Sequence, residues 1–321
     1  MENTFVIILI VSLVGIVFGA DFLVTGAVSI ARKYKVSDFV IGAAIIGVGT
    51  SMPEMTVSFL GALSGNADVA IGNVVGSNIF NVFGILGLTA MFFPITFGRE
   101  NLKFDIPFCV GVSVLLSLLF FNFFIGTDNS IGRFDGLLLL AAFAAFMWIS
   151  FRRDKSEAPQ TTQSEDNGQP VGPVWISALK VIGGLAVLVF SCDVFVDNAV
   201  LIAKSFGVSD SFISLTLIAC GTSLPELAAS IAAAIKKNTS MALGNIVGSN
   251  IFNIALILGL CSQVSPLTST GIGIVDFMVM IAAALVLFMF GKDCRISRGE
   301  GAFLFICFMA YTWYLISNQL A

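Results

Sequence analysis

The sequence predicts an all-α membrane protein of ten transmembrane helices, arranged as two repeats of five. Three observations lead to this prediction: the chain is 57% hydrophobic and only 11% charged, its apolar residues come in long runs, and its two halves match. Soluble domains are about 45–50% apolar and about 25% charged. This chain therefore lacks the polar residues that would cover a surface in water.

Ten apolar segments have about the length of ~20 residues that a helix needs to cross a bilayer. They lie at residues 5–31, 38–64, 69–95, 104–125, 134–151, 174–203, 210–235, 240–264, 272–291 and 301–317. Residues 152–173 are polar and have the composition of a linker. The predicted domains are a five-helix repeat at 1–151, this linker, and a second five-helix repeat at 174–321.

The Lys and Arg residues are distributed unevenly between the two ends of these segments. If the chain crosses the membrane ten times, 14 of its 16 basic residues lie on one side, and only Arg133 and Lys204 lie on the other. Loops rich in Lys and Arg stay in the cytoplasm. We therefore expect a multi-pass protein of the cell inner membrane, with a cytoplasmic linker and both termini in the periplasm or outside.

The two halves are related by an internal duplication. After a shift of 172 positions, residues 37–87 are identical to residues 209–259 at 25 of 51 places. Each repeat has five spans, and because five is odd, the second repeat must enter the membrane with the opposite orientation. Inverted repeats of this kind are typical of secondary transporters, which bind substrate near the bilayer midplane where the repeats meet.

The strongest match between the repeats is GTSMPE at 49–54 and GTSLPE at 221–226. Each motif places a glutamate, Glu54 or Glu226, near the middle of a span, where a charge costs at least ~2.5 kcal/mol. Neither span carries Lys or Arg at that depth, so a bound cation is the expected counter-charge. The alternative is a protonated glutamate in a structural hydrogen bond.

The prolines in these motifs predict a break in each helix. Pro53 has no N–H group and cannot bond to the carbonyl of Gly49, and free carbonyls within a membrane are tolerated where they line a cavity. The hydroxyl groups beside the glutamates are expected to add further oxygen ligands. They belong to Thr50, Ser51, Thr222 and Ser223.

A second repeated motif, GNxxGSNIFN, begins at Gly72 and again at Gly244. Its polar residues recur at four-residue spacing and share one helix face. We expect four of them to contribute to an ion site, with helix packing as the alternative: Ser77, Asn81, Ser249 and Asn253. A site of oxygen atoms alone suits calcium or another hard cation. Two glutamates neutralise one divalent ion or accept monovalent ions in succession, which permits exchange.

Other residues limit or complicate this interpretation. The chain has no histidine, and its six cysteines form no CxxC pair, so neither a zinc site nor a disulfide framework is indicated. Asp21 and Asp193 are repeat-related acids that we expect to be buried, each deep in the first helix of its repeat. For them a structural or gating role and direct ion contact both stay open.

At these motifs the sequence resembles the calcium/cation antiporter superfamily, in particular bacterial sodium/calcium exchangers, over essentially the whole chain. The resemblance implies exchange of Ca²⁺ for Na⁺ by alternating access, Ca²⁺ export, no cofactor, and action as a monomer in the lipid bilayer without nucleic acid. It implies that Glu54 and Glu226 are the central calcium ligands, and that backbone oxygens near Gly47 and Ala219 complete the sites. Many relatives carry Asp where this chain has Asn253, which leaves potassium transport and sodium stoichiometry open.

Three other functions compete with this interpretation. A proton/calcium antiporter belongs to the same superfamily, but the paired hydroxyl groups favour sodium. A passive cation channel requires weak binding at several sites, which buried paired acids do not favour. An intramembrane enzyme is the third alternative, although its two acids would lie in turns broken by proline.

Overall fold

The structure is a computed structural model of the 321-residue chain. It describes residues 2–122, 129–154, 173–205, 219–269 and 271–320. These residues are almost entirely helical, as predicted, because their long apolar runs satisfy backbone hydrogen bonds only within helices when no water is present.

The helices of the first half begin with the long helix α1 and end with α8. Their bounds are α1 Glu2–Tyr34, α2 Asp38–Ile41, η1 Gly42–Gly47, α3 Val48–Thr50, α4 Met52–Leu63, α5 Ala67–Ile79, η2 Phe80–Leu86, α6 Gly87–Phe92, η3 Asn101–Asp105, α7 Ile106–Phe120 and α8 Arg133–Asp154. The segments η1, η2 and η3 are π-helical. Such wide turns often occur at functional sites.

The second half repeats this order from the long helix α9. Its bounds are α9 Val174–Ser205, α11 Ala219–Gly221, α12 Leu224–Ile235, α13 Thr239–Ile251, η5 Phe252–Ile257, α14 Leu258–Val264, α15 Ile274–Phe290, η6 Gly291–Asp293 and α16 Arg298–Leu320. The π-helical segment η5 lies 172 positions after η2. The duplication in the sequence is therefore preserved in an irregular feature of the backbone.

Within the described residues, eight helices are long and apolar enough to cross a membrane. A ninth candidate is the pair formed by residues 38–50 and 52–63, which is bent by 48°. The predicted span at 210–235 is described only from residue 219, where α12 is a shorter apolar helix. The first nine residues of that prediction lie outside the described part of the chain.

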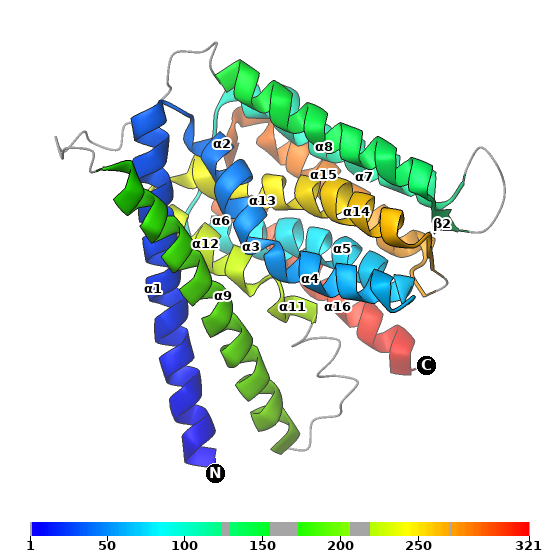
Figure 1. Ribbon diagram of the computed structural model, residues 1–321, viewed down its shortest axis with the longest axis horizontal. Helices are drawn as coiled ribbons and strands as arrows, with labels where there is room; N and C mark the ends of the chain where they lie inside the picture. The colour runs from blue at the N-terminus through cyan, green and yellow to red at the C-terminus, as the bar shows by residue number, and fades with distance from the viewer. Residues whose placement is uncertain (1, 123–128, 155–172, 206–218, 270, 321) are drawn as a thin grey trace.

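Helices α1 and α9 form a distinct pair. Figure 1 shows them side by side, at a steep angle to the bundle formed by the other helices. Small residues allow this close packing: Gly19 of α1 lies against the backbone of Leu188, and Gly184 of α9 lies against the backbone of Leu23.

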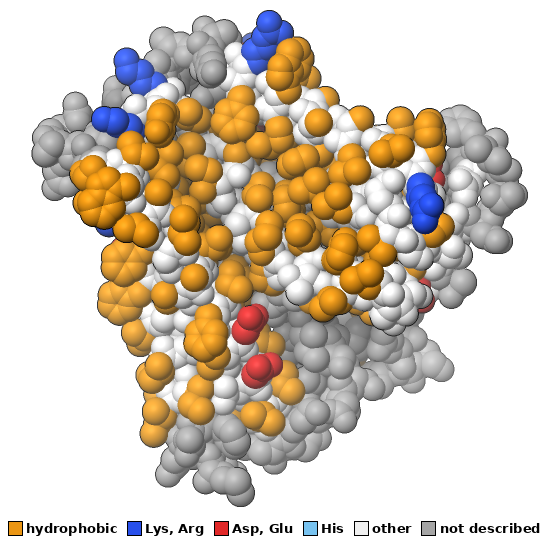
Figure 2. All heavy atoms as spheres, in the orientation of Figure 1, with side chains coloured by type: hydrophobic (Ala, Val, Ile, Leu, Met, Phe, Trp, Pro, Cys, Tyr) orange, Lys and Arg blue, Asp and Glu red, His pale blue; other side chains and the backbone are white. Residues whose placement is uncertain are grey.

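The outer surface is strongly apolar. Large hydrophobic side chains are exposed on the outer helices, including Phe18, Trp148, Ile182, Phe190 and Trp313. Figure 2 shows hydrophobic side chains over most of one face of the molecule. Contiguous apolar surface of this extent indicates contact with lipid, in agreement with the composition.

Four strands of two residues each are an exception to the predicted all-α fold. They are β1 Ile95–Thr96, β2 Ser130–Ile131, β3 Leu267–Thr268 and β4 Arg295–Ile296. β1 pairs with β4, and β2 pairs with β3, both antiparallel. Each pair thus joins one strand from each half. The prediction of a helical membrane protein is confirmed, and these connections were not predicted because strands this short leave no periodic pattern.

Helix α13 forms the centre of the bundle and is almost entirely buried. The π-helical segment η1 packs directly on it. Gly248 makes this possible, because a Cβ atom there would collide with Ala43 of η1, and Gly244 lies equally close to Phe39 of the preceding helix α2. This contact brings the broken helix of the first half against the second half.

Candidate ion-binding site

The helix break predicted at the GTSxPE motifs is present in both halves. Helix α3 ends at Thr50 and α4 begins at Met52, while α11 ends at Gly221 and α12 begins at Leu224. At the break, Ser51 has φ −82° and ψ 10°, and Ser223 has φ −92° and ψ 8°. The prolines lie in the first turn after each break, where a missing N–H group leaves no bond unmade.

The two glutamates are completely buried, and each is bound by a serine of the other half. Ser51 Oγ donates a hydrogen bond of 2.8 Å to Glu226 Oε1. Ser223 Oγ donates one of 2.7 Å to Glu54 Oε1. The contacts are reciprocal across the duplication, so the two carboxyl groups belong to one site.

The second oxygen of each carboxyl group has no such partner. Oε2 of Glu54 and Oε2 of Glu226 are buried and accept no hydrogen bond from any residue that the structure describes. A buried carboxylate oxygen without a donor is costly. Each glutamate therefore offers one oxygen atom to a cation, while the serine bond fixes the other.

The neighbouring helices supply the predicted serine and asparagine side chains, all of them buried. Ser77 Oγ lies 3.2 Å from the hydroxyl of Ser223. Ser249 Oγ donates a 3.2 Å bond to the carbonyl of Gly47. Ser77, Ser249 and Gly47 are thus brought to the two helix breaks, as predicted.

The two asparagines of the set differ. Asn81 Nδ2 donates a 3.0 Å hydrogen bond to Asn250 Oδ1. Both side-chain polar atoms of Asn253 are buried without a hydrogen-bond partner in the described part of the chain. Asn81 and Asn253 lie in the π-helical segments η2 and η5, which face the centre of the bundle.

The threonines also differ between the halves. Thr50 Oγ1 donates to the carbonyl of Ile46 at 3.0 Å and lies 3.3 Å from Asn245 Oδ1. Thr222 lies near the carboxyl group of Glu54, and its hydroxyl has no hydrogen-bond partner among the described residues. For Ala219, the first residue of α11, the structure describes the backbone segment only.

Two residues beside the site were not in the predicted ligand set. Asn73 Nδ2 donates to the carbonyl of Glu54 at 3.1 Å, and Asn245 Nδ2 donates to the carbonyl of Glu226 at 3.2 Å. Both asparagines lie four residues before a predicted serine ligand, Ser77 or Ser249, on the same helix face. That spacing was the signal that could have identified them.

The prediction that Asp21 and Asp193 are buried acids is wrong in the described structure. Both residues are exposed on the long helices. The side chain of Asp21 is 55% exposed and forms a 2.6 Å ion pair with Lys236 at the end of α12. Neither acid approaches the glutamates through a hydrogen bond that the structure describes, so direct ion contact is not supported here.

The chemistry of the site is that of oxygen ligands. The described residues contain no cluster of three or more His, Cys, Asp or Glu side chains that could hold a metal ion. The site instead combines two carboxylates with hydroxyl, amide and backbone oxygens. Such a donor set suits a hard cation bound weakly enough to be released.

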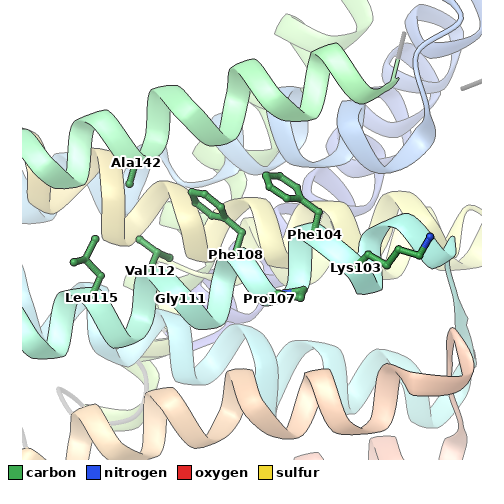
Figure 3. Close-up of a pocket in the computed structure, with 8 residues that line it drawn as sticks. All are labelled: Lys103, Phe104, Pro107, Phe108, Gly111, Val112, Leu115 and Ala142. Atoms are coloured by element: carbon green, nitrogen blue, oxygen red, sulfur yellow. The ribbon is translucent and has the colours of Figure 1, made fainter. Parts of the chain in front are cut away.

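A separate groove of about 400 Å³ lies between α7 and α8 (Figure 3). Phe104, Phe108, Val112 and Leu115 line it, and Lys103 stands at one end. Its lining lacks carboxyl and hydroxyl groups. The groove is therefore unsuited to bind cations and is distinct from the glutamate site.

The chain is similar to known proteins over most of its length. Residues 4–152 and 176–317 match the family model described as sodium/calcium exchanger protein. The chain is 39% identical to CaxA of Alkalimonas amylolytica, over 97% of this chain and 98% of the relative. It is 33% identical to the inner membrane protein YrbG of Escherichia coli, over 96% of both chains.

Among solved structures, the fold is similar to that of the sodium-calcium exchanger NCX_Mj. The TM-score is 0.83 with 32% sequence identity, over 98% of this chain and 100% of that chain. The similarity therefore extends over almost the whole of both chains.

Proposed function

Because this chain belongs to the sodium/calcium exchanger protein family, we propose that it exchanges Ca²⁺ for Na⁺ across the membrane by alternating access and exports Ca²⁺. The observation that carries the proposal is the pair of buried glutamates. Each is held at one oxygen by a serine of the other half and has a second oxygen without a donor in the described structure.

Charge balance explains how one site serves both ions. Two carboxylates neutralise one Ca²⁺, and they equally neutralise Na⁺ ions bound in succession. An empty site with two buried negative charges is unfavourable within the membrane. Movement between the two sides therefore requires a bound cation, which is the condition for exchange.

We propose that the metal ligands are those predicted from the motifs. Glu54 and Glu226 are central, and the other ligands surround them. They are Thr50, Ser51, Ser77 and Asn81 with the carbonyl of Gly47, and Thr222, Ser223, Ser249 and Asn253 with the carbonyl of Ala219. The burial of the named side chains other than Thr222 and the contact of Gly47 with Ser249 support this set.

We further propose ten transmembrane helices in two inverted repeats, at 1–151 and 174–321, joined by a cytoplasmic linker. Both termini would then lie in the periplasm. The strand pairs support this topology, because β1 and β4 fall on the predicted cytoplasmic side and β2 and β3 on the other. The protein would act as a monomer and need no cofactor.

Everted membrane vesicles test the choice of counter-ion. Vesicles loaded with Na⁺ and diluted into Na⁺-free medium should take up radioactive Ca²⁺, and vesicles with only an acidic interior should not. Uptake driven by the proton gradient alone would identify a proton/calcium antiporter instead. Single-channel currents in a planar bilayer would indicate a passive channel.

A further inference from the structure

We infer that Asn73 and Asn245 are positioning residues for ion binding. Each side-chain amide fixes the helix that carries a buried glutamate against the helix that carries the serine and asparagine ligands. The inference rests on the proposed ion site. It assigns a role to residues that do not contact the carboxyl groups themselves.

In the first half, Asn73 joins α5 to the start of α4. Its Nδ2 atom donates to the backbone carbonyl of Glu54 at 3.1 Å and to Ser58 Oγ at 2.9 Å. Both N–H groups of the amide are thus used. Ser77 follows Asn73 by four residues on the same face of α5, and Asn81 follows four residues later in η2, which continues α5.

The second half repeats this contact 172 positions later. Asn245 Nδ2 donates to the carbonyl of Glu226 at 3.2 Å and to Ser230 Oγ at 2.9 Å. Four hydrogen bonds with matching atoms and closely similar lengths occur at equivalent places. A chance packing contact would not be expected to recur with both its acceptors preserved.

The contact of Asn73 affects ion coordination because it is made at the backbone of Glu54 itself. Each residue advances a helix by about 1.5 Å along its axis, whereas a workable metal site holds its ligand distances within about 0.2 Å. A small slip of α4 along α5 would separate Glu54 from Ser77 by more than that tolerance. The amide prevents the slip by bonding to the glutamate's own carbonyl.

Asn245 has an additional contact across the duplication. Its Oδ1 atom lies 3.3 Å from Thr50 Oγ1, close enough to accept the hydroxyl proton when Thr50 does not donate it to the carbonyl of Ile46 at 3.0 Å. Asn245 is also buried, whereas Asn73 is half-buried. Replacing Asn245 therefore disturbs both broken helices, and its effect should be the larger of the two.

The test compares Ca²⁺ binding by purified wild-type protein with binding by Asn73→Ala and Asn245→Ala, together with Na⁺-driven Ca²⁺ uptake in proteoliposomes. Loss of a partner outside the coordination sphere typically weakens metal binding about 10–100-fold. We expect a shift of this size in Ca²⁺ affinity and in the half-saturating Ca²⁺ concentration. The maximal uptake rate should stay close to that of wild type.

Substitutions of Ser58, whose hydroxyl accepts a hydrogen bond from Asn73, provide an independent test. Ser58→Ala should weaken Ca²⁺ binding, while Ser58→Thr, which keeps the hydroxyl, should restore it. Ser64→Ala is the matched control, because Ser64 follows the same helix and bonds only to the nearby carbonyl of Gly61 among the described contacts. It should leave binding unchanged.

Wild-type Ca²⁺ affinity in folded Asn73→Ala and Asn245→Ala protein would overturn the inference. If these two variants do not fold, equal binding by Ser58→Ala and Ser58→Thr would overturn it. Wild-type protein that binds Ca²⁺ without exchanging it for Na⁺ would refute the proposed exchange instead, and the binding comparison would still decide the role of the asparagines.

Discussion

The two halves of the molecule hold their glutamates in the same way but surround them differently. The serine–glutamate bonds are reciprocal, at 2.8 and 2.7 Å. In contrast, the Thr50 hydroxyl lies within hydrogen-bond distance of the Ile46 carbonyl and of Asn245 Oδ1, whereas the hydroxyl of its counterpart Thr222 has no partner among the described residues. Repeats of related sequence thus make unequal contacts.

The proposed alternating access would require such a difference. If two equivalent halves are to open the site first to one side and then to the other, they must differ in any single state. The opposite state is then reached when the halves exchange their arrangements. In that state we expect Thr222 to lie within hydrogen-bond distance of Asn73, as Thr50 does of Asn245 here.

The largest effects should come from the symmetric part of the site. Glu54→Gln and Glu226→Gln should each lower Ca²⁺ affinity at least about 100-fold, or about 2.8 kcal/mol of binding free energy, because either change removes one of two charges that balance Ca²⁺. Equilibrium binding and vesicle uptake measure this. Normal transport by only one of these two variants would show that the two glutamates contribute unequally to ion binding.

Substitutions of Thr50 and Thr222 should show directly how the two halves differ. Thr50→Val removes a buried donor that lies within hydrogen-bond distance of the Ile46 carbonyl and of Asn245 Oδ1, which should cost about 1–3 kcal/mol of stability. Thr222→Val should cost less stability, because no described hydrogen bond is lost, while still weakening Ca²⁺ binding. Thermal unfolding of both variants in detergent tests this difference, and equal destabilisation would contradict it.

The ion pair between Lys236 and Asp21 is a second asymmetric contact. The equivalent pair in the other half would be Ser64 and Asp193, which cannot form an ion pair. Because both side chains of the existing pair are partly exposed, 31% and 55%, it should contribute about 0–1 kcal/mol. Lys236→Gln should therefore change the maximal uptake rate by less than about fivefold.

A double-mutant cycle makes this prediction specific. Lys236→Gln and Asp21→Asn should have less than additive effects when combined, because either change alone removes the same interaction. Lys237→Gln is the matched control, since Lys237 is the adjacent exposed residue. Additive effects would show that the two residues act separately.

The smallest effect concerns Glu100, at the end of the bundle predicted to be cytoplasmic. Hydrogen bonds from Lys103 and Arg153 hold the pKa of Glu100 below its ordinary value of 4.5. A lowered carboxyl pKa stabilises the folded state above about pH 4.5, and this contribution is lost as the pH falls through the lowered pKa. Wild type and Glu100→Gln should differ slightly in unfolding temperature at neutral pH and converge at acid pH.

The repeated motifs predicted the centre of the site because they leave local signals. A glutamate in an apolar run and a proline one residue before it indicate a buried charge and a broken helix without any tertiary information. Both features are found at Glu54 and Glu226. The duplication itself showed that the two places are equivalent.

The partners of these residues could not be predicted in the same way. Ser51 was expected to lie beside Glu54 on its own helix, but its hydroxyl bonds to Glu226, 175 positions away. Helical periodicity identifies neighbours within one helix only. The role of Asn73 depends on the backbone carbonyl that its amide reaches, which the identity of the residues does not show.

The two small strand pairs have a consequence for biosynthesis. β1 is made early but pairs with β4, which lies close to the C-terminus, and β2 must await β3. When only residues 1–151 have been synthesised, β1 and β2 therefore have no strand to pair with. Correct assembly of the first half must wait until nearly the whole chain has entered the membrane, and a chain that stops before residue 295 would leave β1 unpaired.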